Sequence, residues 1–252
     1  MKLLASDFDG TLAFNNQIKE EDVKKIKEFQ SLGHYFGMST GRDRLGILNI
    51  TNRYGIHLDF LVLASGAKLI DETGKIFYQK PLSKKLVQDI YKATQYQEEY
   101  MFFNDGNNCI LNPNTLRPKE IKIIENINEL EEETYSFLAI HFKEGEEDKA
   151  QEATDFINQH FNEDVIAYRN TYNVDIVAKG CSKGQGVLIM ADHFNIAPED
   201  LYVIGDSMND IPMFDITNNA YSFYHIEPSL KKHVNYYVHS VAECIDEILK
   251  GK

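Results

Sequence analysis

Short apolar runs alternate with helical segments over the first part of this chain of 252 residues. The clearest helical segment places Val23, Ile26, Phe29 and Leu32 at helical spacing, and Gly33 follows where the helix should end. Alternation of strand and helix predicts an α/β fold built on a doubly wound parallel sheet. The predicted strands are residues 2–8, 34–39 and 60–64, and the predicted helices are residues 19–32 and 43–53.

A mixed block of about a hundred residues interrupts this pattern after Pro81. The alternation resumes at Lys183, so we predict a discontinuous core of residues 1–80 and 181–252 and an inserted α+β domain of residues 81–180. The remaining elements expected before and within the insert are a hairpin at 68–79, helices at 83–95 and 147–161, two short strands in 100–111 around a turn at 104–107, and strands at 136–142, 164–168 and 172–178. After the insert we expect a helix at 183–193, a strand at 201–204 and a helix at 240–249.

Composition limits the classes of protein to which the chain can belong. Hydrophobic residues make up 43% of it, which is enough for a substantial core, and no apolar run reaches the length of about 18 residues that a membrane span needs. The apolar stretch at the N-terminus is too short for a secretory signal, so we expect a cytoplasmic protein. A formal net charge of −13 argues against a nucleic-acid partner but is compatible with a site for a divalent cation.

The cysteines indicate packing rather than chemistry. They are three in number and far apart, and no Cys-x-x-Cys pair suggests zinc or a redox dithiol. We therefore expect them to be reduced and packed in the interior. Nothing in the sequence indicates an oligomeric state. The cysteines are Cys109, Cys181 and Cys244.

Two carboxylates, Asp7 and Asp9, stand at the end of the first predicted strand, followed by Gly10. Because the chain leaves the strand here, the two side chains can approach one point from different backbone angles. One carboxylate can then attack a substrate while the other transfers a proton. An Asp-Gly sequence is equally typical of a polar turn, and this segment alone leaves both interpretations open.

A second acidic cluster, residues 205–210, follows the predicted strand 201–204. Open α/β sheets bind ligands at the carboxyl ends of their strands, and Thr40 follows another strand in the same way. We expect Asp206 and Asp210 to join Asp7 there, where the three carboxylates can hold Mg²⁺.

The same edge can bind a phosphate. Thr40 offers a hydroxyl, Lys183 a cationic side chain, and the turn after the first strand backbone N–H groups. A metal ion and a lysine together would allow an anionic carboxylate to attack an anionic phosphoryl group. The set is typical of phosphoryl transfer through an aspartyl phosphate.

These residues resemble the four ordered motifs of a haloacid dehalogenase superfamily phosphatase, of the Cof-like branch with a class IIB cap. The resemblance covers the whole chain, including the place of the insert between the second and third motifs, and it implies a Rossmann-like core with an inserted cap domain. The matching segments are Asp-Phe-Asp-Gly-Thr-Leu at 7–12, Thr40 before Gly41-Arg42, Ser182-Lys183-Gly184, and Gly-Asp-x-x-Asn-Asp at 205–210.

The resemblance also implies a role for each matching residue. Asp7 would be the nucleophile and Asp9 the general acid and then the general base. An acid at position 9 favours phosphate esters, since dehalogenases of the superfamily lack it. The phosphate-binding positions would be Thr40, Lys183, Gly10 and Gly41, and Mg²⁺ would be held by the Asp7 carboxylate, the Asp9 carbonyl and Asp206, supported by Asn209 and Asp210.

Several residues keep alternative interpretations. Thr40 alone is also typical of a helix N-cap, and Lys183 alone of an exposed surface lysine. Asn209 and Asp210 are also typical of residues that only cap a helix, here at 211–214. Arg42 either reaches the site or pairs with a surface acid, and it stays unassigned.

Ser65 stands before Gly66 where many relatives carry Asn, so a substrate contact made by that Asn is not expected here. In the insert, Asn107, Arg169 and Tyr172 are candidates for contact with the substrate.

We therefore predict a Mg²⁺-dependent phosphatase that hydrolyses small phosphorylated metabolites, such as sugar phosphates or cofactor-type phosphates. A phosphomutase or phosphotransferase built on the same motifs is an alternative, in which an alcohol accepts the phosphoryl group. A non-catalytic protein that binds phosphorylated ligands is a third possibility, but it predicts the loss of a motif residue, and none is lost.

Overall fold

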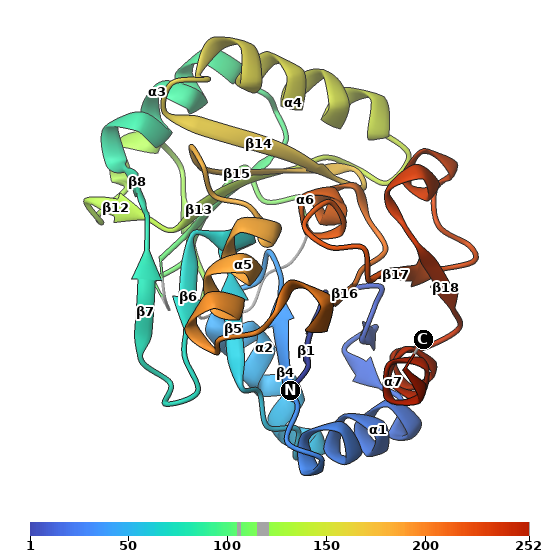
Figure 1. Ribbon diagram of the computed structural model, residues 1–252. Helices are drawn as coiled ribbons and strands as arrows, with labels where there is room; N and C mark the ends of the chain where they lie inside the picture. The colour runs from blue at the N-terminus through green and yellow to red at the C-terminus, as the bar shows by residue number, and fades with distance from the viewer. Residues whose placement is uncertain (105–106, 115–120, 252) are drawn as a thin grey trace. The chain divides into compact units, whose positions relative to one another are not determined.

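The computed structural model describes residues 1–104, 107–114 and 121–251 (Figure 1). The chain forms two compact units, here called the core unit (Met1–Tyr78 and Ser182–Lys252) and the inserted unit (Gln79–Cys181). The predicted turn at 104–107 includes Asp105 and Gly106, which lie outside the described residues. No helix in the described parts of the chain is long and apolar enough to cross a membrane.

A parallel sheet forms the centre of the core unit, as the alternating pattern predicts. Within the described residues its strand order is β18-β17-β16-β1-β4-β5-β6-β7, parallel from β18 to β5, with β6 antiparallel to β5. The strands are β1 (Leu3–Ser6), β4 (Tyr35–Ser39), β5 (Phe60–Leu63), β6 (Lys68–Ile70), β7 (Ile76–Gln79), β16 (Leu201–Ile204), β17 (Ala220–Phe223) and β18 (Tyr236–Val238). These elements confirm the predicted α/β fold. β17 and β18 were not expected from the sequence, and neither was the small hairpin of β2 (Ala13–Phe14) and β3 (Gln17–Ile18).

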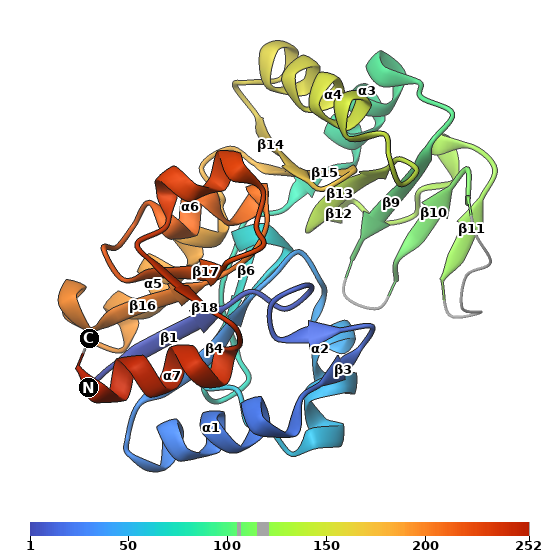
Figure 2. The same ribbon diagram turned by 90° about the vertical axis from the view of Figure 1, so that its right-hand side faces the viewer.

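Helices cover both faces of this sheet. On one face α1 (Glu20–Ser31) and α7 (Val241–Lys250) lie side by side, with α2 (Arg44–Thr51) on the same face (Figure 2). On the other face lie α5 (Lys183–His193) and α6 (Ile211–Phe214). Strand β1 is buried between the two layers, because Leu4 packs with the first set of helices while Leu3 and Ala5 pack with the second. Asp7 directly follows the carboxyl end of this buried strand.

The inserted unit has a sheet of its own, with the order β11-β10-β9-β13-β15-β14 and mostly antiparallel neighbours. A separate short pair joins β8 to β12. The elements are β8 (Leu82–Ser83), α3 (Lys84–Thr94), β9 (Glu99–Phe103), β10 (Cys109–Leu111), β11 (Lys122–Ile124), β12 (Thr134–Tyr135), β13 (Phe137–His141), α4 (Glu147–His160), β14 (Val165–Asn170) and β15 (Asn173–Ala178).

Short 3₁₀ turns complete the fold. Two of them shape the edge of the core sheet, because Ala64–Gly66 follows β5 and Met208–Asp210 follows β16. The others are Asn52–Tyr54, Ile127–Glu129, Pro198–Asp200 and Pro228–His233.

Candidate active site

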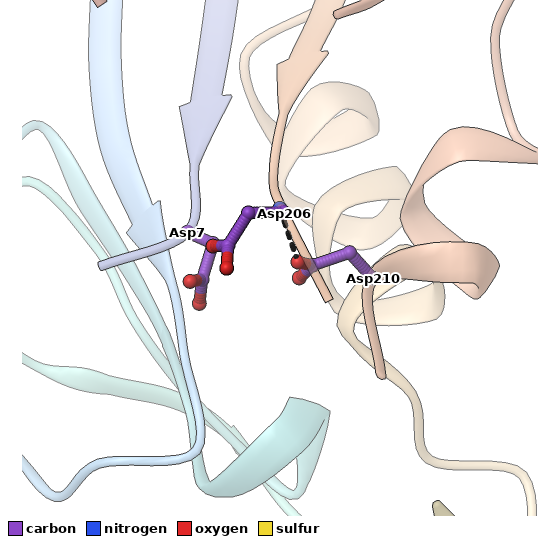
Figure 3. Close-up of side chains that lie close together, drawn as sticks. All are labelled: Asp7, Asp206 and Asp210. Atoms are coloured by element: carbon purple, nitrogen blue, oxygen red, sulfur yellow. Dashed lines mark hydrogen bonds between the residues drawn. The ribbon is translucent and has the colours of Figure 1, made fainter. Parts of the chain in front are cut away.

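Three acidic side chains meet at the carboxyl ends of β1 and β16. Asp7 directly follows β1, and its N–H donates to the carbonyl of Ile204, the last residue of β16, at 2.9 Å. This bond extends the pairing of the two strands, so the loops that carry Asp7 and Asp206 leave the sheet together. Figure 3 shows the side chains of Asp7, Asp206 and Asp210 grouped at this edge, and each offers an oxygen within 4.8 Å of the others.

Lys183 joins this group from the first turn of α5. Its Nζ donates to Asp7 Oδ1 at 2.7 Å, to Asp210 Oδ1 at 2.6 Å and to Asn209 Oδ1 at 3.1 Å. The lysine is buried, with 2% of the residue exposed, and the interpretation as a surface lysine is therefore wrong. Burial and the positive end of a helix dipole both disfavour a cation at this place, so the three acceptors are needed to hold it there.

Asp210 supports the loop more than it offers ligands. Its Oδ2 accepts from the N–H groups of Asp206 and Ser207, both at 2.9 Å, and its Oδ1 accepts from Lys183. The Ser207 side chain accepts in turn from the backbone of Asp210, which completes a capping box. Asp210 thus shapes the acidic loop through its side chain, while α6 begins without a side-chain cap.

The electrostatics of the cluster favour a bound cation. Burial raises the pKa of Asp7 well above its ordinary value; Lys183 opposes the rise, and Asp210 and Asp206 add to it. Burial, and then Asp210, raise the pKa of Asp206 to about 7. Burial alone would lower the pKa of Lys183, but Asp210 and Asp7 outweigh it and raise that pKa.

Three carboxylates therefore lie beside one ammonium group, which bonds to Asp7 and Asp210, and this leaves excess negative charge at the edge of the sheet. Hard divalent cations such as Mg²⁺ prefer this donor set of carboxylate oxygens. Asp7 and Asp206 are the two carboxylates best able to ligate, because both oxygens of Asp210 already accept hydrogen bonds. The residues present fit a metal ion.

Thr40 lies at the same edge, one residue after β4. It is 1% exposed, its N–H donates to Val62, and its Oγ1 accepts from the N–H of Arg42 at 3.1 Å. The N-cap interpretation of Thr40 is wrong, because Asp43 caps α2 by accepting from Gly46 at 2.7 Å.

The neighbouring loop contains Ser65, which is buried and has a left-handed φ of +48°. Its N–H donates to the carbonyl of Thr40 at 3.0 Å. At Gly66 an added Cβ would lie within 2.1 Å of the carbonyl oxygen of Ser182, so this loop packs tightly against the residue that precedes Lys183. Ser65 and Gly66 are therefore part of the support for the segments that carry Thr40 and Lys183.

The two glycines predicted to bind phosphate differ in their surroundings. The N–H of Gly10 donates to the Ala13 carbonyl at 3.0 Å, so it is engaged within its own turn. Gly10 has a φ of +80°, and an added Cβ would lie 2.5 Å from Asp206 Oδ2. Its contribution here is space and backbone conformation beside Asp206. Gly41 is half-buried and directly follows Thr40.

Asp9 stands apart from the acidic cluster. Its side chain is 56% exposed and forms a bidentate pair with Arg42, with Nε–Oδ2 and Nη2–Oδ1 distances of 2.7 and 2.6 Å. The structure thus answers the question left open for Arg42, which pairs with a residue of the first motif. One feature of the sequence pointed to Arg42, namely its position two residues after Thr40.

The sequence did not predict that Thr11 contacts the acidic loop. The hydroxyl of Thr11 donates to Asp206 Oδ1 at 2.5 Å, although Thr11 and Asp206 are 195 residues apart in the sequence. Thr11 belongs to the first motif, but nothing in its local pattern indicates a bond to the acidic loop.

The three candidates in the inserted unit do not form one cluster. Asn107 follows β9, and its Nδ2 donates to Glu132 Oε1 at 2.9 Å. Arg169 and Tyr172 lie at the β14–β15 turn, at the other end of the same sheet; the Arg169 guanidinium donates to Gln151 and to the Thr171 carbonyl. Tyr172 lines an open hollow of about 520 Å³ with His141 and Lys143 among its neighbours. Of the three, Asn107 lies at the end of the sheet from which β15 leads back towards residue 181.

Comparison with known proteins places this geometry in a family. A family model for haloacid dehalogenase-like hydrolases matches residues 4–247. The chain is 24% identical to the phosphatase YwpJ of Bacillus subtilis, over 85% of this chain and 86% of that protein. It is 26% identical to 5-amino-6-(5-phospho-D-ribitylamino)uracil phosphatase YwtE of the same organism, over 100% of this chain and 99% of that protein. The solved structure of a HAD/COF-like hydrolase from Plasmodium vivax shares the fold, with a TM-score of 0.86 and 20% identity over 100% of this chain and 96% of that one.

Proposed function

Because the chain belongs to the family of haloacid dehalogenase-like hydrolases, we propose that it is a Mg²⁺-dependent phosphatase of small phosphorylated metabolites. The observation that carries the proposal is the buried contact of Lys183 with Asp7 beside Asp206. A nucleophilic carboxylate, a fixed cation and a set of metal ligands then lie within a few ångströms, which is the arrangement that attack on a phosphate ester requires. The names of the two Bacillus relatives support the same activity.

In the proposed reaction, a carboxylate oxygen of Asp7 attacks the phosphorus atom and the bond to the leaving oxygen breaks. Asp9 donates a proton to that oxygen, and an aspartyl phosphate remains on Asp7. Asp9 then accepts a proton from water as the water oxygen attacks phosphorus, which releases inorganic phosphate and restores Asp7.

The other site residues bind and orient the phosphate. Lys183 would place its positive charge between Asp7 and the transferring group, and the Thr40 hydroxyl would donate to a phosphate oxygen. Asp7, the Asp9 carbonyl and Asp206 would hold Mg²⁺, with Asn209 and Asp210 supporting them. When bound, the ion supplies charge that neutralises the phosphate oxygens.

We also propose a role for the inserted unit and a location for the protein. The inserted unit would be the cap that contacts the leaving group, with Asn107, Arg169 and Tyr172 as candidate contacts. Leaving groups of metabolite size, such as sugars or cofactor precursors, are consistent with the name of the relative YwtE. The cysteines Cys109, Cys181 and Cys244 are buried as free thiols, which supports a reducing compartment such as the cytoplasm.

The test is the substitution Asp7→Asn, assayed with p-nitrophenyl phosphate in Mg²⁺. We expect turnover to fall by at least about 10³-fold, because the amide is a poor nucleophile. Asp192→Asn, on the exposed side of α5, is the matched control and should keep full activity. Undiminished turnover of Asp7→Asn would rule out the assignment.

A screen of phosphorylated metabolites, ranked by kcat/KM, would then identify the substrate class. Release of inorganic phosphate should accompany every turnover. Its absence, with the phosphoryl group recovered on an alcohol, would show a phosphotransferase instead.

A further inference from the structure

Arg42 contacts three segments of the core unit that meet at the candidate site, namely residues 8–9, Asn16 and Thr40. Its guanidinium holds both oxygens of Asp9, and Nη2 also donates to Asn16 Oδ1 at 2.9 Å, in the turn between β2 and β3. Its Cζ lies 5.0 Å from the centre of the Phe8 ring. Its own N–H donates to the Thr40 hydroxyl.

These contacts are better suited to positioning than to stability. Arg42 is 30% exposed and Asp9 56% exposed, and ion pairs with that exposure add little to folding. A bidentate guanidinium nevertheless fixes the plane of a carboxylate, which a single contact cannot do. The stacking on Phe8 and the bond to Asn16 fix the guanidinium in turn, so the orientation of Asp9 depends on the contacts of Arg42 with the β2–β3 turn and with the ring of the preceding residue.

The orientation of the Asp9 side chain matters because the acidic cluster lies nearby. Asp7, Asp206 and Asp210 form an acidic cluster that attracts a cation, and Asp9 is not among the carboxylates of that cluster in the described residues. A carboxylate that turned into the cluster would act as one more ligand and would no longer face a leaving oxygen. The Arg42 contact holds Asp9 on the exposed side.

We propose that Arg42, held by Asn16 and Phe8, is the positioning residue that keeps Asp9 beside the site and out of the acidic cluster, and that Asp9 gives up one of its two hydrogen bonds to Arg42 when it transfers its proton. The proposal rests on the proposed phosphatase function, in which Asp9 donates the proton that the leaving oxygen takes up. It predicts that Arg42 matters most for esters whose leaving group needs that proton.

The test compares two esters in kcat/KM, which reports the steps up to transfer of the phosphoryl group to Asp7. p-Nitrophenyl phosphate has a leaving group that departs readily without an acid, whereas an alkyl phosphate from the metabolite screen needs one. In Arg42→Lys, which keeps the charge but loses the bidentate geometry, we expect about a tenfold loss with the alkyl ester and less than about twofold with the aryl ester. Asn16→Ala should show a smaller loss with the same selectivity for the alkyl ester.

Two controls separate positioning from structural damage. Arg53→Lys, the same substitution at an exposed residue whose guanidinium donates to the Asn49 carbonyl four residues earlier, should change neither rate. In an Asp9→Asn background, Arg42→Lys should cause no further loss with the alkyl ester, because there is no acid left to position.

Equal losses with both esters, no loss with the alkyl ester, or a full additional loss in the Asp9→Asn background would overturn the proposal. Failure of the phosphatase function itself would be visible separately, because the wild-type protein would then release no phosphate from either ester.

Discussion

Replacement of Asp206 by Asn should make the metal-free protein more stable, even though Asp206 is a proposed metal ligand. Among the described residues, Lys183 is the cation that contacts the acidic cluster; it bonds to Asp7 and Asp210, and Asp206 bonds through its side chain to the Thr11 hydroxyl. An Asn side chain has the same shape and can still accept from Thr11. The substitution therefore removes a poorly compensated charge without removing the contact.

The size of the effect follows from the pKa of Asp206, which burial raises from 3.8 to about 7. A shift of about 3 units corresponds to roughly 4 kcal/mol of preference for the neutral carboxyl in the folded state. Asp206 is half-buried and shares the cluster with two further carboxylates, so we take half of this, about 2 kcal/mol.

The sign fixes the pH range of the effect. Because the pKa of Asp206 is higher in the folded state, the contribution of its neutral carboxyl to the free energy of unfolding is fully present below about pH 4. This contribution is lost as the pH rises through about 7. Above that pH the wild-type protein carries the whole penalty. Asp206→Asn, which cannot ionise, carries none of it.

Urea unfolding in EDTA, measured from about pH 4 to about pH 8, would test this reasoning. The two proteins should have equal free energies of unfolding near pH 4, and the variant should be more stable by about 2 kcal/mol near pH 8. Mg²⁺ should reverse the order by stabilising only the wild type, by about 2.7 kcal/mol at a concentration of about 100 times Kd. The exposed control Asp192→Asn should differ from the wild type by no more than about 0.5 kcal/mol throughout. A variant that is less stable than the wild type near pH 8 in EDTA, or a difference that does not depend on pH, would refute the argument.

Three further predictions concern other parts of the chain. Lys183→Met should lower the free energy of unfolding near neutral pH by about 3–5 kcal/mol, measured by urea unfolding, because two buried carboxylates lose their cation; an unchanged midpoint would contradict the structure. Gly66→Ala should cost more than about 2 kcal/mol through a backbone clash, whereas Gly33→Ala, with a similar φ of +82° and open space around it, should cost only about 1 kcal/mol; equal costs would show that the clash is relieved. Asn107→Ala should raise KM for the best metabolite several-fold and leave kcat/KM for p-nitrophenyl phosphate unchanged. Tyr172→Phe is the comparison. A larger effect of Tyr172→Phe on KM would show that residues at the other end of the inserted sheet determine the selectivity.

Much of the core fold could be predicted because its helices and central strands have clear patterns. The predicted helix 19–32 corresponds to α1, Glu20–Ser31, and the predicted strand 201–204 to β16 with the same bounds. β17 and β18 were missed because polar residues interrupt or flank their apolar runs, so periodicity does not distinguish them from loops. They become strands only because the edge of the parallel sheet is there to pair with them.

The sequence predicts which residues meet at the candidate site, but not the hydrogen bonds between them. Parallel strands end at one edge, so the meeting of Asp7, Thr40 and Asp206 at this edge follows from the strand assignment alone. The bonds within the site do not follow from it. That Asp210 caps the acidic loop, or that Arg42 holds Asp9, depends on side-chain directions that no local pattern encodes.

The two aspartates of the first motif are each held by a cation, and the two cations differ in a way that matches the proposed roles. Asp7 is bound by Lys183 at an edge where both residues are almost fully buried, so it has little freedom to move. That suits a nucleophile, which must meet phosphorus along one direction. Asp9 is bound by Arg42 at the exposed side, where water can replace either hydrogen bond at little cost. That suits a residue that must exchange its partner twice in one turnover, first for a leaving oxygen and then for water. The sequence places the two carboxylates one residue apart, and it is the difference in burial of their partners that allows them different chemistry.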